Sequence, residues 1–258
     1  MAKSSKQSRK RRVLDIAAEP QPDRRVRKKS AQIKADEAWQ RSQAAPLVCL
    51  TAAQERYLAT IRQNIVTFGV GPAGTGKSHI ALKYACQEID AGRYQGIVIL
   101  RPLVEMGDRL GALPGELKDK MAPWSTAFMK ILYGHYGRAV TEAKLNGAHP
   151  SIEFQAIQHI RGDTFADRIV IVDEAQNTTP EQMKTILTRI GEDSKLILNG
   201  DLEQSDIRGK SGLAVAMEII SHVANVGVAR FVEEDIVRSG ICKDILIAYR
   251  DYARAKQK

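Results

Sequence analysis

Downstream of Pro46, short runs of apolar residues alternate with stretches in which apolar positions recur at helical spacing. The apolar runs, each bounded by turn-forming residues, predict strands at 64–69, 96–101, 168–172, 195–199 and 227–232. Because strands that alternate with amphipathic helices form βαβ units, the pattern predicts a mainly parallel sheet covered by helices on both faces. The expected fold class is therefore α/β.

Two of the stretches between strands place four apolar residues at positions i, i+3, i+4 and i+7, so each predicts a helix that lies on the sheet. These positions are Leu82, Ala85, Cys86 and Ile89 in the first stretch, and Met183, Ile186, Leu187 and Ile190 in the second. The second helix also has clear boundary signals. They are Thr179 as N-cap, Pro180 at the first helical position, Gln182 to complete a capping box, and Gly191 just beyond the end.

The segment 102–160 interrupts the alternation and is interpreted as a long insertion. It contains a Gly- and Pro-rich piece at 107–115 and a predicted helix. One side of that helix carries Trp124, Ala127, Phe128, Ile131 and Leu132. With the insertion included, residues 47–258 are expected to form one domain, because a chain of this length can bury a full hydrophobic core.

The net charge of +9 is concentrated at the N-terminus. Residues 1–46 contain 13 Lys and Arg against 5 Asp and Glu, a balance of +8, whereas the remainder has 26 against 25. This apolar-poor segment is expected to be a disordered arm, with transient helix near 31–40. It could contact nucleic-acid phosphates, and the alternative is a tail that serves only solubility. Trp39 is its one aromatic residue, so any binding should be non-specific and salt-dependent.

Composition also limits the setting in which the protein is expected to work. Cys49, Cys86 and Cys242 are scattered and odd in number, which fits reduced packing residues better than a disulfide framework or a metal site. The apolar runs are too short to span a bilayer, and the basic N-terminus lacks the apolar stretch of a secretory signal. A cytoplasmic protein without a membrane span is expected.

Residues 71–78 fit the pattern GxxxxGK[ST], and they lie between a predicted strand and a predicted helix, as a phosphate-binding loop does. The motif comprises Gly71, Pro72, Ala73, Gly74, Thr75, Gly76, Lys77 and Ser78. Its glycines allow backbone N–H groups to converge on phosphate oxygens, and the helix adds its positive N-terminal end. Lys77 is then expected to reach the β- and γ-phosphates of ATP, and the Ser78 hydroxyl to ligate Mg²⁺. The alternative is a chance glycine-rich turn.

Two further loops follow predicted strands and should meet the first loop, because ligands collect at the carboxyl ends of parallel strands. Asp173 would hold Mg²⁺ and Glu174 would orient or deprotonate the attacking water, although such a pair can also serve only as a turn. In the loop after Asn199, Asp201 and Gln204 would lie beside the same phosphate. For this second loop an ordinary Gly-Asp turn remains an equal alternative.

Several strings of residues together resemble the PhoH-like ATPases. They are 71–77, Arg101-Pro102, Leu-Pro-Gly-Glu-Leu at 113–117, Ile-Arg-Gly at 160–162, Asp-Glu-Ala-Gln-Asn-Thr-Thr-Pro-Glu-Gln-Met at 173–183, Leu-Thr-Arg-Ile-Gly at 187–191, and Gly200-Asp201. The resemblance extends from about residue 50 to 252. It implies a single RecA-like domain, similar to the first motor domain of superfamily 1 helicases, with a role in RNA or DNA metabolism.

Position by position, the resemblance implies the roles given above for Lys77, Ser78, Asp173 and Glu174, and it matches Gln204 to the glutamine of a helicase Gly-Asp-x-x-Gln motif. Gln54 resembles a glutamine that recognises adenine, although Thr51 and Gln54 also spell a capping box. Arg238 resembles an arginine that approaches the γ-phosphate, and the alternative is an exposed arginine that starts the last helix. Asp163 and Ser239 depart from the family, which often has arginine and histidine there; this affects the expected coupling but not nucleotide binding.

The expected activity is Mg²⁺-dependent hydrolysis of ATP, coupled to RNA or single-stranded DNA as in helicases. A P-loop kinase with an acceptor site in the insertion is one alternative, and a switch or assembly factor that turns over slowly is another. Superfamily 1 helicases close two motor domains over one ATP, whereas this chain has one. A homo-oligomer is therefore expected, and a ring-shaped hexamer is one candidate for its size. Arg238 or Arg208 would then lie near the nucleotide of the neighbouring subunit.

Overall fold

The computed structural model describes residues 47–102, 117–160, 164–207 and 209–237, together with Gly162, Gly240, Ile241, Ile245 and Ala248. Several expectations therefore lie outside the described residues. They concern the arm at 1–46, the piece at 107–115, the side chain of Trp124, and the residues Asp163, Arg208, Arg238, Ser239 and Cys242. Among the described thiols, Cys49 and Cys86 are free.

The described strands form a six-stranded sheet in which every pairing is parallel. In chain order they are β1 (Val66–Val70), β2 (Gly96–Arg101), β3 (Ile152–Ala156), β4 (Arg168–Val172), β5 (Lys195–Gly200) and β6 (Val226–Arg230). Across the sheet their order is β3-β2-β4-β5-β1-β6. The α/β class and the parallel sheet predicted from the apolar pattern are confirmed.

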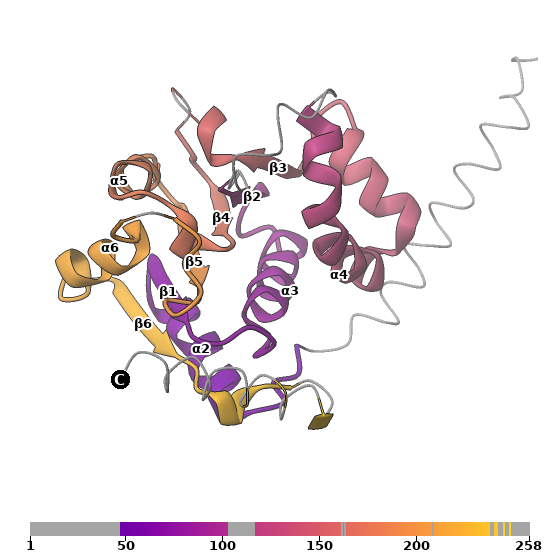
Figure 1. Cartoon of the computed structure of the whole chain (residues 1–258). Helices are drawn as coiled ribbons and strands as arrows, with labels where there is room; N and C mark the ends of the chain where they lie inside the picture. The colour runs from indigo at the N-terminus through magenta and orange to yellow at the C-terminus, as the bar shows by residue number, and fades with distance from the viewer. Residues whose placement is uncertain are drawn as a thin grey trace, which may run out of the picture.

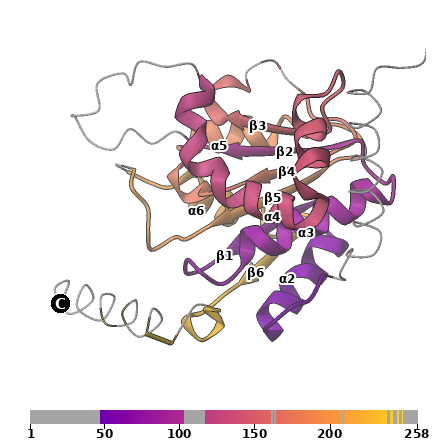
Figure 2. The same cartoon turned by 90° about the vertical axis from the view of Figure 1, so that its right-hand side faces the viewer.

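Helices cover both faces of the sheet, as Figures 1 and 2 show. One face packs against α2 (Ala52–Gln63), α3 (Lys77–Asp90) and α4 (Leu117–Asn146), and the other against α5 (Pro180–Leu187) and α6 (Gly212–Ile220). Alternate residues of a strand therefore face different helices. In β4, Ile169 and Ile171 belong to the first core, and Val170 and Val172 to the second. This double burial explains why the central strands are apolar throughout.

Three strands differ at their ends from the predicted ranges, since β5 also extends one residue past 199, and one further strand was not predicted. Strands β1 and β6 are displaced from 64–69 and 227–232 by up to two residues. Strand β3 pairs with β2 inside the segment interpreted as an insertion, so this segment supplies part of the sheet as well as α4. The polar positions of β3, Glu153 and Gln155, are compatible with an edge strand that is only partly buried.

Helix α5 begins as predicted and ends earlier. Thr179 and Gln182 form the expected capping box, and Pro180 opens the helix. The helix stops at Leu187, however, and Gly191 does not follow it directly. The reason is a tertiary contact: the Gly191 N–H donates to the Phe165 carbonyl at 2.7 Å, which fixes the chain beside the segment before β4.

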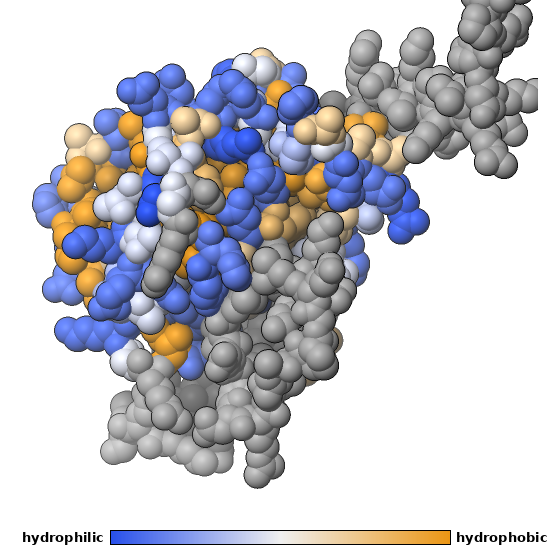
Figure 3. Space-filling model, turned by 90° about the horizontal axis from the view of Figure 1, so that it is seen from above, coloured by the Kyte–Doolittle hydropathy of each residue, from blue (hydrophilic) through white to orange (hydrophobic). Residues whose placement is uncertain are grey.

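The surface seen from above in Figure 3 is mostly hydrophilic, with small apolar patches between the polar side chains. Within the described parts of the chain, no helix is long and apolar enough to cross a membrane.

Candidate nucleotide-binding site

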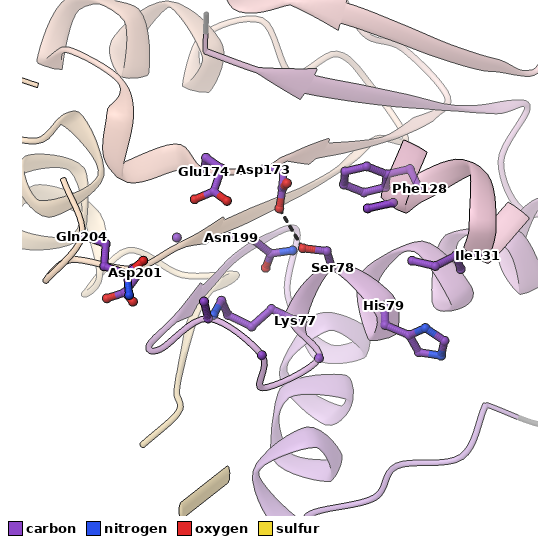
Figure 4. A pocket seen from close by; sticks show the side chains of 15 residues that line it. Lys77, Ser78, His79, Phe128, Ile131, Asp173, Glu174, Asn199, Asp201 and Gln204 are labelled. Atoms are coloured by element: carbon purple, nitrogen blue, oxygen red, sulfur yellow. Dashed lines mark hydrogen bonds between the residues drawn. The ribbon is translucent and has the colours of Figure 1, made fainter. Parts of the chain in front are cut away.

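Three loops meet at the carboxyl edge of the sheet because β4, β5 and β1 are neighbours. The loop after β1 contains the GxxxxGK[ST] motif, the loop after β4 begins with Asp173 and Glu174, and the loop after β5 contains Asp201 and Gln204. They surround one cavity of about 320 Å³ (Figure 4). Its wall is formed by Ala73, Gly74, Gly76, Lys77, Ser78, His79, Ala127, Phe128, Ile131, Asp173, Glu174, Asn199, Gly200, Asp201 and Gln204. The predicted convergence of the three loops is thus present.

The loop at 71–76 has the backbone that its glycines allow. Gly74 and Gly76 both have φ of 85°, and Gly71 has φ of 142° with no room for a side chain, since a Cβ would lie 2.3 Å from the Phe231 carbonyl oxygen. Helix α3 begins directly after Gly76, so its first N–H groups face the cavity end of the loop. Within the loop, the Thr75 hydroxyl donates to the Pro72 carbonyl at 3.0 Å. A helix N-terminus behind such a loop is a suitable place for phosphate.

Lys77 is buried and folds back over its own loop. Its ammonium group donates to the carbonyls of Gly71 at 2.7 Å and Pro72 at 2.8 Å. Burial lowers the pKa of Lys77, and the carboxylates of Asp201, Asp173 and Glu174 oppose that shift. An anion bound in the cavity would therefore also stabilise the charged form of Lys77, whose ammonium group is already held in place by the loop.

Asp173 is buried at the end of β4, where the Ser78 hydroxyl donates to its Oδ1 atom at 2.7 Å (Figure 4). Burial raises the pKa of Asp173; the bond from Ser78 and the positive charges of Arg101 and Lys77 counteract the shift. Glu174, the next residue, has a left-handed backbone with φ of 53°. Because of this turn, two consecutive carboxylates line the same cavity.

The hydroxyl of Ser78 and the carboxylate of Asp173 are hard oxygen ligands in contact with each other, which fits Mg²⁺. Among the described residues, no group of three or more His, Cys, Asp and Glu could hold a metal by itself. Mg²⁺ usually binds one or two protein oxygens together with phosphates and water.

Gln176 connects the second loop to the third, a role that the sequence motifs do not indicate. Its Nε2 donates to Glu174 Oε2 at 2.7 Å and to the Gln204 carbonyl at 3.3 Å, and its Oε1 accepts from the Asp201 N–H at 3.0 Å. Position 200, which lies beside the Gln176 side chain, needs a glycine, because a Cβ there would lie 2.8 Å from Gln176 Oε1. The loop that carries Gln204 is therefore positioned by a buried amide.

Asn199, at the end of β5, is a second residue of the cavity wall that motif spacing does not reveal. Its Oδ1 accepts from the buried Tyr57 hydroxyl at 2.5 Å, which orients the amide. Of the side-chain nitrogen and oxygen atoms in the described residues, Asn199 Nδ2 is buried with no hydrogen-bond partner. A buried donor without a partner is costly, so its position at the cavity makes it a candidate to contact a ligand.

Gln54 is buried in α2 against the phosphate-loop motif. Its Nε2 donates to the Thr75 carbonyl at 2.9 Å, and its Oε1 accepts from the Leu50 N–H at 2.7 Å. Only half of the expected capping box is present: Thr51 Oγ1 accepts from the Gln54 N–H, but the Gln54 side chain bonds to Leu50 rather than to the N–H of Thr51. The Gln54 amide thus uses one hydrogen to hold the phosphate loop at Thr75 and one oxygen lone pair to hold Leu50.

The parallel sheet and the phosphate-loop motif at its edge define the class of protein as a P-loop NTPase of the α/β type. The family model described as "PhoH-like protein" matches residues 46–250. The chain therefore belongs to the PhoH-like family.

Individual relatives are similar over most of this chain. A PhoH-like protein of Bacillus subtilis is 40% identical over 77% of this chain and 62% of its own length. A PhoH-like protein of Mycobacterium leprae is 38% identical over 78% and 58%, and Protein PhoH of Escherichia coli is 36% identical over 80% and 58%. The chain thus spans about three fifths of the length of these relatives.

Among solved structures, the Pif1 helicase of Candida albicans is similar with a TM-score of 0.35 and 14% identity. The matched region covers 72% of this chain and 41% of that helicase.

Proposed function

We propose that the chain binds ATP together with Mg²⁺ and hydrolyses it to ADP and phosphate. The observation that carries the proposal is the 2.7 Å hydrogen bond between Ser78 and Asp173 in the wall of the cavity that Lys77 also lines. A phosphate loop and an acidic residue at the end of a nearby parallel strand are what a metal–nucleotide site requires.

Phosphate binding is assigned to residues 71–78. The N–H groups of the loop and of the first turn of α3 would contact the phosphates, and Lys77 would exchange its bonds to the Gly71 and Pro72 carbonyls for β- and γ-phosphate oxygens. Ser78 and Asp173 would hold the metal. A Mg²⁺ ion held by these two residues would supply positive charge to neutralise the phosphates.

Hydrolysis is assigned to Glu174, which would orient or deprotonate the attacking water, and to Gln204, which would sense the γ-phosphate or position the water. Both line the cavity, and Gln176 ties them to each other. Arg238 is proposed to supply positive charge at the γ-phosphate, as the resemblance implies. The acidic residue and the glutamine favour water over another acceptor, and hence hydrolysis over the kinase alternative.

The direct test is phosphate release from ATP by the wild type and by Glu174→Gln, each with single-stranded RNA, single-stranded DNA or no polymer. We expect Glu174→Gln to bind nucleotide and to lose at least about 100-fold in rate, the scale of general-base catalysis. Equal rates for the two proteins would overturn the assignment. Transfer of the phosphate to a recovered acceptor, with none to water, would indicate a kinase.

Coupling to RNA or single-stranded DNA is a further part of the proposal. Its support is the basic segment 1–46, with 13 Lys and Arg against 5 Asp and Glu. Stimulation of hydrolysis by one polymer would identify the partner. Deleting residues 1–46 is expected to weaken binding to the polynucleotide and to reduce the dependence of that binding on salt. An unchanged affinity for RNA and DNA would exclude a role of this segment in binding.

We also propose a homo-oligomer, since one motor-like domain lacks the second face that would close over ATP. Arg238 or Arg208 would then approach a neighbour's nucleotide. Size-exclusion chromatography with light scattering, with and without ATP, tests this. A strict monomer in both conditions would contradict it.

A further inference from the structure

Arg101 is the last residue of β2, and its guanidinium lies beside both consecutive carboxylates of the site. Nη1 is 3.5 Å from Asp173 Oδ2, and Nη2 is 3.6 Å from Glu174 Oε1. The two contacts follow from the sheet, since β2 pairs with β4 and Leu100 is level with Val172, the residue before Asp173. A cation from a neighbouring strand thus lies at the acidic end of the cavity.

Both contacts of Arg101 with the carboxylates are longer than hydrogen bonds. Charge-assisted hydrogen bonds measure about 2.7–2.9 Å, so both separations indicate electrostatic attraction without a fixed bidentate hydrogen bond. The backbone of Arg101 is anchored by its pairing with Ala156 in β3, whereas its long side chain is 29% exposed.

Glu174 is restrained from two sides in this arrangement. Its Oε1 is next to Arg101, and its Oε2 accepts a hydrogen bond from Gln176. A carboxylate that is to orient or deprotonate water must offer an oxygen to that water. Withdrawal of Arg101 would free one.

Asp173 has a related arrangement. Its Oδ1 accepts from Ser78, and Oδ2 is the atom nearest Arg101. The guanidinium therefore supplies positive charge at the carboxylate that would hold Mg²⁺. Two cations that share one carboxylate oppose each other's binding, and this opposition is reciprocal.

We propose that Arg101 is a positioning residue that holds Glu174 and Asp173 in a resting arrangement and must withdraw before hydrolysis. The inference rests on the proposed ATPase function and adds a restraint that keeps basal turnover low. Arg101 acts through the two carboxylates, so removing its charge should change the metal requirement and the turnover number.

The test compares Arg101→Gln and Arg101→Lys with the wild type. Arg168→Gln is the matched control, because Arg168 is equally exposed, pairs with Glu153 at 2.8 Å, and lies at the opposite end of the neighbouring strand β4. The first readout is the Mg²⁺ concentration that half-saturates binding of a fluorescent ADP analogue. The second is kcat and KM for ATP without polynucleotide.

We expect Arg101→Gln to lower the half-saturating Mg²⁺ concentration by roughly fivefold or more, the low end of typical coupling between sites, and to raise kcat with little change in KM. Arg101→Lys keeps the charge and should remain near wild type, as should Arg168→Gln. Arg101→Met, which keeps part of the aliphatic stem, repeats the test if Arg101→Gln does not fold.

An unchanged Mg²⁺ requirement in Arg101→Gln would overturn the inference, as would a kcat below that of the wild type. Failure of the wild type itself to bind Mg²⁺–nucleotide or to hydrolyse ATP would instead overturn the proposed function. The two failures are thus distinguishable.

Discussion

Ser78 donates a 2.7 Å hydrogen bond to Asp173, although 95 positions separate the two residues in the sequence. The bond is possible because β5 is the single strand between β1 and β4, so the loop after β1 and the loop after β4 flank one point on the sheet edge. Both side chains offer oxygen to the same cavity. The central claim, a single metal–nucleotide site, depends on this contact.

The charge of buried Asp173 should lower stability at neutral pH. Burial raises the pKa of this carboxyl above its ordinary value, so the folded state holds the proton more tightly than the unfolded chain. Between the ordinary and the raised pKa the folded state binds more protons, and the stability that this group contributes therefore falls as pH rises. Asp173→Asn keeps an oxygen for Ser78 and should raise the thermal midpoint at pH 7 by a few degrees while weakening Mg²⁺ binding.

Thermal unfolding of Asp173→Asn and the wild type at several pH values checks this. The advantage of the variant should shrink as pH falls and Asp173 becomes protonated. A lower midpoint for the variant at pH 7 would contradict the prediction.

Gln176→Ala should impair hydrolysis through the third loop. The change leaves the Asp201 N–H without its acceptor and releases Glu174 and the Gln204 carbonyl, at a cost of about 1–3 kcal/mol of stability. Asn177→Ala is a matched control, since the Asn177 side chain exchanges hydrogen bonds with Asp206 in the same loop. Its hydrogen bond to the Glu174 carbonyl is made by the backbone N–H, which the change leaves in place.

Both variants are expected to unfold at lower urea concentration, but kcat should fall much further in Gln176→Ala. Equal effects on kcat would mean that Gln176 only supports the loop.

Gln54 is predicted to recognise adenine, and it also braces the phosphate loop through the Thr75 carbonyl. One amide hydrogen and one oxygen lone pair remain for a base. Gln54→Ala should therefore weaken ATP binding more than GTP binding. Competition titrations against a fluorescent nucleotide measure the ratio of the two affinities. Equal weakening of both would assign Gln54 to the loop alone.

Much of the fold could be predicted from local patterns because the central strands are buried on both faces. The strands predicted at 96–101 and 168–172 have the same bounds as the observed β2 and β4. The continuous apolar runs do not include strand β3, in which Ile152, Phe154 and Ala156 alternate with Glu153 and Gln155. This alternation was the available signal for a partly buried strand at the edge of the sheet. The early end of α5 depends on a contact of Gly191 with Phe165, which helical periodicity does not encode.

The same distinction applies to the site. The loop at 71–78 is recognisable because its chemistry depends on consecutive residues. Arg101, Gln176 and Asn199 depend instead on the order and register of neighbouring strands, so their contacts emerge only in the fold. Arg101 carried two sequence signals, its position at the end of a strand and its place in the family string Arg101-Pro102. Neither indicates the contact with Asp173 and Glu174 without the knowledge that β2 lies beside β4.

A double-mutant cycle over Ser78→Ala and Asp173→Asn tests the central claim most directly, with the Mg²⁺ dependence of fluorescent-nucleotide binding as the measurement. If the two residues hold one metal, each single change should weaken Mg²⁺ binding by about tenfold or more, and the double variant should lose little beyond either single one. Two independent losses that simply add, or no effect of either change on the Mg²⁺ requirement, would contradict a single metal–nucleotide site.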